Sequence, residues 1–135
     1  MNQTKTIMSS TINRYALEDR LVDYAVMMIT ISEKTGNSGA GKTLAGQLCR
    51  SGTSPALNYA EAQGAESKRD FLHKIKITLK ELRESYVTLK ILAHAQLVEK
   101  SPLDAALKES NELVSIFVKI AKTTEANLTM EKIKK

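Results

Sequence analysis

Apolar residues recur at intervals of three and four over most of the chain, which is the spacing of one face of an α-helix. The most regular stretch predicts a helix over residues 68–98. Its apolar positions are Leu72, Ile75, Leu79, Leu82, Tyr86 and Leu89. The same spacing predicts helices at about residues 14–34, 42–63 and 102–130. We therefore expect an all-α, antiparallel up-down four-helix bundle in a single domain over residues 1–135, because the connections are too short to cross a bundle.

Residues that start and stop helices agree with these boundaries. Ser67 and Asp70 have the spacing of a capping box at the start of the third helix, and Pro102 suits the first position of the fourth. Gly64 suits a left-handed cap at the end of the second helix. Pro55 lies inside the second helix and is expected to kink or interrupt it there, because proline lacks the backbone donor.

Composition limits the class of protein further. With 6 Gly and 2 Pro among 135 residues, and 42% hydrophobic residues, the chain is typical of a globular domain instead of a disordered or fibrous one. Its apolar runs are too short for a membrane span, and residues 1–10 do not form a signal peptide. Cys49 is the single cysteine, and no His or Cys residues have metal-ligand spacing. We expect a cytoplasmic protein with no membrane, metal or cofactor partner. The formal net charge of +5 mildly favours an anionic partner.

The residues from Gly36 to Thr43 match the pattern G-x-x-x-x-G-K-[ST] of a phosphate-binding loop. In such a site Gly36, Gly41, Lys42 and Thr43 would hold phosphates and magnesium between a buried strand and a helix. Here the preceding apolar residues continue a helical periodicity, and no second apolar strand ends in a magnesium-binding carboxylate. We interpret the segment as a loop between helices that imitates the motif. The alternative is a P-loop nucleotide-binding protein.

Three stretches in the middle of the chain form a distinctive pattern. They are Gln47-Leu48-Cys49-Arg50-Ser51-Gly52-Thr53-Ser54-Pro55-Ala56-Leu57-Asn58-Tyr59-Ala60-Glu61-Ala62, Ser67-Lys68-Arg69-Asp70-Phe71 and Leu79-Lys80-Glu81-Leu82-Arg83-Glu84. This pattern resembles the four-helix bundle family of proteins encoded in intervening sequences of bacterial 23S rRNA genes. The resemblance is strongest over about residues 47–97. It implies a ring-like homopentamer with no established enzymatic activity, and a variable connection at residues 36–43.

A stripe of polar residues follows the second helix at steps of three, four and three. Its members are Ser51, Ser54, Asn58 and Glu61. The stripe could line a ligand pocket or form a hydrogen-bonded seam between helices. The seam is favoured, because buried polar groups need partners. We expect Arg50 to join this structural polar seam by pairing with Glu81 or Glu84 of the third helix.

A line of basic residues runs along the third helix at steps of four, three, four and three. It consists of Arg69, His73, Lys76, Lys80 and Arg83. Helical spacing places these residues away from the apolar face, so we expect them to face solvent. They could follow the phosphate backbone of RNA or DNA, with little aromatic character for base stacking. The alternative is a solvated charged face without a ligand.

The expected function is therefore that of a non-enzymatic, oligomeric scaffold or adaptor. Its candidate partners are a second copy of the chain, RNA or DNA, and another protein. The sequence also contains more apolar and aromatic side chains than the core of one four-helix bundle is expected to bury, which favours oligomerisation. These include the four tyrosines Tyr15, Tyr24, Tyr59 and Tyr86.

Overall fold

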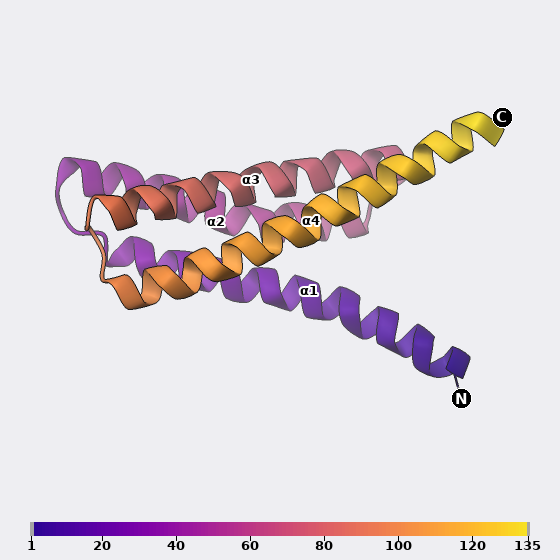
Figure 1. Ribbon diagram of the computed structural model, residues 1–135, viewed down its shortest axis with the longest axis horizontal. Helices are drawn as coiled ribbons and strands as arrows, with labels where there is room; N and C mark the ends of the chain where they lie inside the picture. The colour runs from indigo at the N-terminus through magenta and orange to yellow at the C-terminus, as the bar shows by residue number, and fades with distance from the viewer. Residues whose placement is uncertain (1, 135) are drawn as a thin grey trace.

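The computed structural model describes the backbone of residues 2–134 and the side chains of residues 16–134. It contains four α-helices, which are α1 (Asn2–Glu33), α2 (Gly39–Gln63), α3 (Lys68–His94) and α4 (Lys100–Lys134). Successive helices run in opposite directions, so α1 and α3 point one way and α2 and α4 the other (Figure 1). No strand occurs within residues 2–134. The predicted all-α antiparallel bundle is confirmed.

The helices pack mainly against their neighbours in sequence. The contacts of α2 with α1 and α3, and of α3 with α4, are extensive, whereas the contact between α1 and α4 is small. The backbones of the diagonal pairs, α1 with α3 and α2 with α4, do not approach each other closely within the described part of the chain. These pairs meet through side chains that cross the core, such as Tyr24 of α1 with Ser85 of α3. In Figure 1 the N-terminal part of α1 and the C-terminal part of α4 extend past the turn between α2 and α3 and diverge. The closed part of the bundle is therefore its middle and the end opposite the chain termini.

The core is mostly aliphatic and receives side chains from all four helices. Its fully buried large members are Leu21, Tyr24, Met28, Ile31, Leu48, Ile75, Leu82, Leu89, Leu92, Leu103, Leu113 and Phe117. The ring of Phe117 in α4 meets the ring of Tyr59 in α2 edge to face, with centroids 5.5 Å apart. This arrangement is favourable for aromatic pairs because the positive edge of one ring meets the negative face of the other.

Two serine side chains cap the middle helices at their N-termini. The Ser67 hydroxyl accepts a hydrogen bond from the Asp70 backbone N–H at 3.0 Å, so the predicted cap of α3 is confirmed. The Ser38 hydroxyl accepts from the Gly41 N–H at 3.0 Å, and α2 begins at Gly39 instead of near Lys42. The backbone of α2 continues through Pro55 without interruption.

The end of α3 differs from the expectation, because the helix stops at His94 instead of continuing to residue 98. Gln96 follows with φ of 56°, a left-handed conformation. The Leu97 N–H donates to the Leu92 carbonyl at 3.1 Å and the Gln96 N–H donates to the Ala93 carbonyl at 3.2 Å. This pair of bonds is a Schellman motif, which normally uses glycine at the left-handed position. A glutamine there gives no signal in the sequence.

Other helix limits also differ from the predicted ones. Helix α1 begins at Asn2 instead of near residue 14, and α4 extends from Lys100 to Lys134 instead of over residues 102–130. No glycine or proline stands in residues 2–13 to end a helix, although these residues lack a regular apolar face. The prediction for Gly64 was wrong, because its φ of −98° is not left-handed.

Candidate nucleic-acid interface

The five residues of the predicted basic line lie on the outward face of α3. Arg69, His73, Lys76, Lys80 and Arg83 are all exposed. The opposite face of the helix carries buried residues such as Leu82 and Leu89. The solvent-facing position expected from the helical spacing is therefore confirmed. Two further exposed residues, Val87 and Ile91, continue the same stripe toward the C-terminus of α3.

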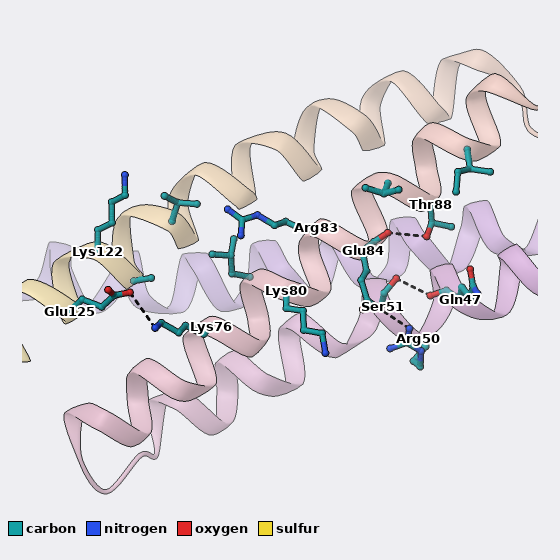
Figure 2. A pocket seen from close by; sticks show the side chains of 15 residues that line it. Gln47, Arg50, Ser51, Lys76, Lys80, Arg83, Glu84, Thr88, Lys122 and Glu125 are labelled. Carbon is teal, nitrogen blue, oxygen red and sulfur yellow. Dashed lines mark hydrogen bonds and ion pairs between the residues drawn. The ribbon is translucent and has the colours of Figure 1, made fainter.

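A groove of about 940 Å³ lies over this face of α3, between flanking side chains of α2 and α4. Figure 2 shows the side chains that line it. Its basic members are Arg50 of α2, Lys76, Lys80 and Arg83 of α3, and Lys122 of α4. Its apolar members are Leu79, Val87, Ile91, Val118 and Ala121. The groove thus combines an apolar surface with positive charge from three helices.

Two of the cations in the groove are neutralised by carboxylates of the same chain. Arg50 donates to Glu84 at 3.0 Å, and the Lys76 ammonium lies 3.4 Å from the Glu125 carboxylate (Figure 2). Arg50 also donates to Glu81 at 3.2 Å. The hydrogen bond to Glu84, together with the charges of Glu81 and Glu84, raises the pKa of Arg50 above its usual value. Arg50 is therefore held as a cation by its partners on α3.

The other three cations, Lys80, Arg83 and Lys122, form no ion pair with any described residue. Because the groove's two remaining charged residues, Glu84 and Glu125, already have partners, the positive charge of these three is uncompensated locally. An anion entering the groove would meet cations from α3 and α4 at once.

Sequence reasoning missed the contribution of α4. Lys122 lies in the predicted fourth helix, but only the packing of α4 beside α3 brings it to the same groove as Lys80. The first two members of the basic line, Arg69 and His73, do not line the groove. Lys68, next to Arg69, is paired with Glu131 of α4. The basic surface is thus a patch around residues 76–83 and Lys122, shorter along α3 than predicted.

The predicted polar seam is present only in part. Arg50 links α2 to α3 through both candidate carboxylates, Glu81 and Glu84. In contrast, the small polar residues bond within α2 instead of across to another helix. The Ser51 hydroxyl donates to the Gln47 carbonyl at 2.8 Å, and the Asn58 amide donates to the Ser54 hydroxyl at 2.9 Å.

The last member of the stripe, Glu61, lies 3.6 Å from the Lys74 ammonium of α3. The contacts between helices along this stripe therefore come from charged side chains, and the serines and the asparagine satisfy their polar groups locally. Local bonding of this kind is common for Ser, Thr and Asn inside helices.

Replacing Arg50 by alanine is expected to lower the free energy of unfolding by only about 0.5 kcal/mol, because its side chain is 60% exposed and exposed ion pairs contribute little. The measurement is a urea denaturation curve followed by circular dichroism. A double-mutant cycle of Arg50→Ala with Glu84→Ala should give a coupling energy below about 1 kcal/mol. A loss of several kcal/mol would contradict this weak structural role.

A second polar cluster is buried and belongs to the core. The Tyr24 hydroxyl of α1 donates to the Ser110 hydroxyl of α4 at 2.9 Å and shares a hydrogen bond with the Ser85 hydroxyl of α3 at 2.7 Å. Burial is the main cause that raises the pKa of Tyr24 above its usual value. The cluster joins three helices in the interior and offers no opening to a ligand, since Tyr24, Ser85 and Ser110 are all fully buried.

About one turn before Tyr24 along α1, an ion-pair network joins α1 to α4. Arg20 binds the Glu109 carboxylate with two bonds of 2.7 Å and Glu112 with one of 2.6 Å. The hydrogen bond to Glu109 raises the pKa of Arg20 above its usual value. Two-pronged binding of a guanidinium to a carboxylate fixes geometry as well as charge, so it aligns the two outer helices.

The tyrosines do not support oligomerisation in the way the sequence suggested. Tyr24 is fully buried and Tyr59 is 4% exposed, both inside one copy of the chain. Tyr86 is partly exposed, and the Tyr15 side chain lies outside the described residues. Exposed large apolar side chains instead occur on all four helices, and those of α1 and α3 are Val22, Val26, Ile29, Val87 and Ile91.

The segment that matches a phosphate-binding loop spans the end of the turn between α1 and α2 and the first residues of α2. It follows a helix instead of a strand, and the Gly41 N–H is bonded to the Ser38 hydroxyl. A Cβ at Gly41 would lie 2.7 Å from the Thr35 carbonyl oxygen, and Gly36 has a φ of 89°. These glycines are therefore required by the shape of the turn. Lys42 and Thr43 are exposed in the first turns of α2.

None of the helices within residues 2–134 combines the length and apolar character needed to cross a membrane. The described side chains contain no cluster of three His, Cys, Asp or Glu residues placed to hold a metal ion.

The fold and the groove define the chain as an all-α four-helix bundle with a basic, partly apolar surface on one side. Residues 19–119 match the family model described as 23S rRNA-intervening sequence protein. The chain belongs to this family, as the pattern in its middle helices suggested.

A solved structure has the same arrangement of helices. It is a crystal structure of a protein of unknown function from the S23 ribosomal protein family of Bacteroides thetaiotaomicron. The two chains are 28% identical and superpose with a TM-score of 0.72, over 78% of this chain and 97% of the other. A comparison with curated proteins finds no match.

Proposed function

We propose that this chain is a non-enzymatic, oligomeric scaffold of the cytoplasm that binds the phosphate backbone of RNA or DNA in the groove over α3. The observation that carries the proposal is the set of three exposed cations, Lys80, Arg83 and Lys122, which line one groove without carboxylate partners. A polyanion supplies the missing negative charge. The family has no established function, so the argument depends on the chemistry of this surface.

Binding in this groove would be directed to phosphates instead of bases. None of the residues that line it is aromatic, so it offers no platform on which bases could stack. Lysine and arginine side chains that neutralise phosphates release condensed counterions, which makes the affinity strongly dependent on salt. With three free cations, the logarithm of the affinity for duplex DNA should fall with the logarithm of salt concentration with a slope of about −2.7 for one copy.

Oligomerisation would multiply this weak contact. A ring of five copies, the number that the family resemblance implies, would present the groove five times to one nucleic-acid strand. Linked sites bind a long ligand far more tightly than one site does, because the second contact becomes intramolecular. We therefore expect longer RNA or DNA to bind more tightly than fragments that reach only one groove.

The test is fluorescence anisotropy with labelled 30-nucleotide RNA and 30-base-pair DNA of arbitrary sequence, at 50 and 200 mM salt. Reversing two of the three cations, with Lys80→Glu and Lys122→Glu together, should weaken binding at 50 mM salt by about 10-fold or more and flatten the salt dependence. The matched control is Lys100→Glu with Lys108→Glu, which makes the same change of net charge at exposed residues of α4 that do not line the groove and lie about 33 and 21 Å before Lys122 along the helix.

The control pair should change the affinity by less than about 3-fold, because distant surface charges are screened at these salt concentrations. Equal losses in the two pairs would show that net charge matters and the groove does not. No binding by the unmodified chain at 50 mM salt would overturn the proposal entirely. Circular dichroism of each variant checks that the bundle remains folded.

A further inference from the structure

The outward face of α1 carries an apolar strip with acidic ends. Val22, Val26 and Ile29 follow each other at steps of four and three and are 47%, 56% and 38% exposed. Asp19 stands one turn before the strip and Glu33 one turn after it, and both are exposed. Asp23 is also exposed and flanks the strip. Large apolar side chains in a row on a helix surface usually mark a contact with another molecule.

The outward face of α3 carries a second apolar strip near its C-terminus, with basic ends. Val87 and Ile91 are 52% and 45% exposed and lie one turn apart. Arg83 lies one turn before the strip, Lys90 lies beside it, and His94 lies one turn after it. All three residues are exposed. The Lys90 ammonium lies 5.6 Å from the centre of the Tyr86 ring, which keeps it beside the strip.

The two strips have opposite flanking charges and comparable lengths. From Asp19 to Glu33 the axis of α1 rises by about 21 Å, and from Arg83 to His94 the axis of α3 rises by about 16 Å. Long basic side chains cover the difference. One copy of the chain cannot join its own strips, because α1 and α3 are diagonal in the bundle and their backbones do not approach each other closely within the described residues. The two helices meet through the interior, where Tyr24 bonds to Ser85. Their outward faces point to opposite sides.

We infer that the α1 strip of one copy packs on the α3 strip of the next copy. Val22, Val26 and Ile29 then cover Val87 and Ile91, and the acidic ends of the α1 strip meet the basic ends of the α3 strip. A second copy is the occupant that the charges favour, because the chain itself provides the acidic amphipathic helix that the α3 strip fits. This inference rests on the oligomeric state proposed above and names the surfaces that produce it.

An interface between two different faces is head-to-tail. Each copy uses both faces, so the copies form a ring if the rotation between neighbours closes and an open chain if it does not. Lys80 and Lys122 lie toward the end of the groove that holds Lys76 and Glu125 (Figure 2). Ile91 lies about three turns beyond Lys80 along α3. Phosphates could therefore be bound beside Lys80 and Lys122 while the apolar end is covered by the next copy. Arg83 stands at the border between these two parts.

Complementation of two variants tests the head-to-tail geometry. One variant carries Val22→Asp and Val26→Asp, which disrupt the α1 strip, and the other carries Val87→Asp and Ile91→Asp, which disrupt the α3 strip. All four side chains are about half exposed, so the fold of a single copy should survive. Light scattering after size-exclusion chromatography should find each variant as a monomer of about 14.9 kDa.

An equimolar mixture of the two variants should form a 1:1 dimer, because each variant retains the face that the other lacks. The two disrupted faces, both carrying added aspartates, repel each other and stop further growth. Leu57→Asp is the control, since Leu57 is 67% exposed on α2 and belongs to neither strip, and it should leave the oligomer unchanged.

The outcomes separate the inference from the proposed function. If the unmodified chain is itself a monomer, the oligomeric part of the proposed function fails together with the inference. If the unmodified chain is an oligomer and either double variant keeps its mass, only the inference fails. Monomeric variants that do not associate on mixing would also overturn it, since each variant retains the face that the other lacks. Nucleic-acid binding is tested separately through Lys80 and Lys122.

Discussion

Replacing Gly52 by alanine should lower the free energy of unfolding by about 2 kcal/mol. Gly52 is buried in α2 against α1, and a Cβ there would lie 2.1 Å from Met28 Cγ and 2.5 Å from Met28 Cβ. The Met28 Cβ is fixed to its backbone, so a change of rotamer cannot relieve the second contact. The two helices must separate, and this cost exceeds the gain of about 1 kcal/mol that alanine normally brings to a helix interior.

Gly46 provides the matched control for this substitution. It lies in the same helix, is exposed, and a Cβ there would meet no described atom within 4 Å. Gly46→Ala should therefore stabilise the protein by up to about 1 kcal/mol, the helix-propensity difference alone. Urea denaturation of the two variants measures both values. The same sign at Gly46 and Gly52 would contradict the close approach of α1 and α2.

The dependence on Met28 can be measured directly. Met28→Ala removes the Cγ that would lie 2.1 Å from the added Cβ but keeps the Cβ at 2.5 Å. Adding Gly52→Ala to that variant should therefore cost less than adding it to the unmodified chain, but should remain destabilising. The difference is a coupling energy, which is expected for residues in contact and absent for distant ones. Gly52 stands within the sequence pattern Arg50-Ser51-Gly52-Thr53-Ser54, and the close packing gives a physical reason for glycine in the middle of a helix.

The number and order of the helices could be predicted because they depend on a signal carried by each segment alone. The apolar series of α3, from Leu72 to Leu89, has helical spacing without a slip, and Ser67 provides an N-cap that the structure confirms. Helix ends were less predictable where unusual residues form them. Gln96 adopts a conformation that normally calls for glycine, so the sequence placed the end of α3 several residues too late.

The candidate site was predictable only as far as it lies on one helix. Spacing alone placed Lys76, Lys80 and Arg83 on the solvent face of α3. Lys122 could not be found in this way, because nothing in the sequence fixes how α4 is rotated against α3. For the same reason Glu125 could not be recognised as the partner of Lys76. Packing between helices decides which cations are neutralised and which remain available.

The tyrosines show the limit of a composition argument. The sequence suggested that a single bundle would leave them exposed, but Tyr24 reaches hydroxyl partners on two other helices and is fully buried. A small polar partner at the correct depth allows a tyrosine to be a core residue. Ser85 and Ser110 are such partners, and each belongs to a predicted helix. Their alignment with Tyr24 follows from the tertiary packing.

Tyr24→Phe should lower the free energy of unfolding by about 2 kcal/mol at neutral pH. The substitution keeps the ring and removes the hydroxyl that bonds to Ser110 at 2.9 Å and to Ser85 at 2.7 Å. The Ser110 hydroxyl then lies buried without its donor, and an unsatisfied buried polar group is more costly than the loss of an exposed hydrogen bond. Tyr86→Phe makes the same chemical change at a partly exposed site and should alter stability by less than about 0.5 kcal/mol.

The difference between the unmodified chain and Tyr24→Phe should shrink at alkaline pH. Burial raises the pKa of Tyr24 in the folded state above the ordinary value of 10.0, so above about pH 10 the unfolded chain loses a proton that the folded chain retains. The stability that depends on the protonated hydroxyl is complete below pH 10 and falls by about 1.4 kcal/mol per pH unit between the unfolded and folded pKa values. Phenylalanine has no such proton, and the titration of other groups cancels in the comparison. Urea denaturation of both proteins at pH 7, 9, 10 and 11 measures the difference, and a constant value from pH 9 to 11 would show that the Tyr24 hydroxyl is not held protonated in the core.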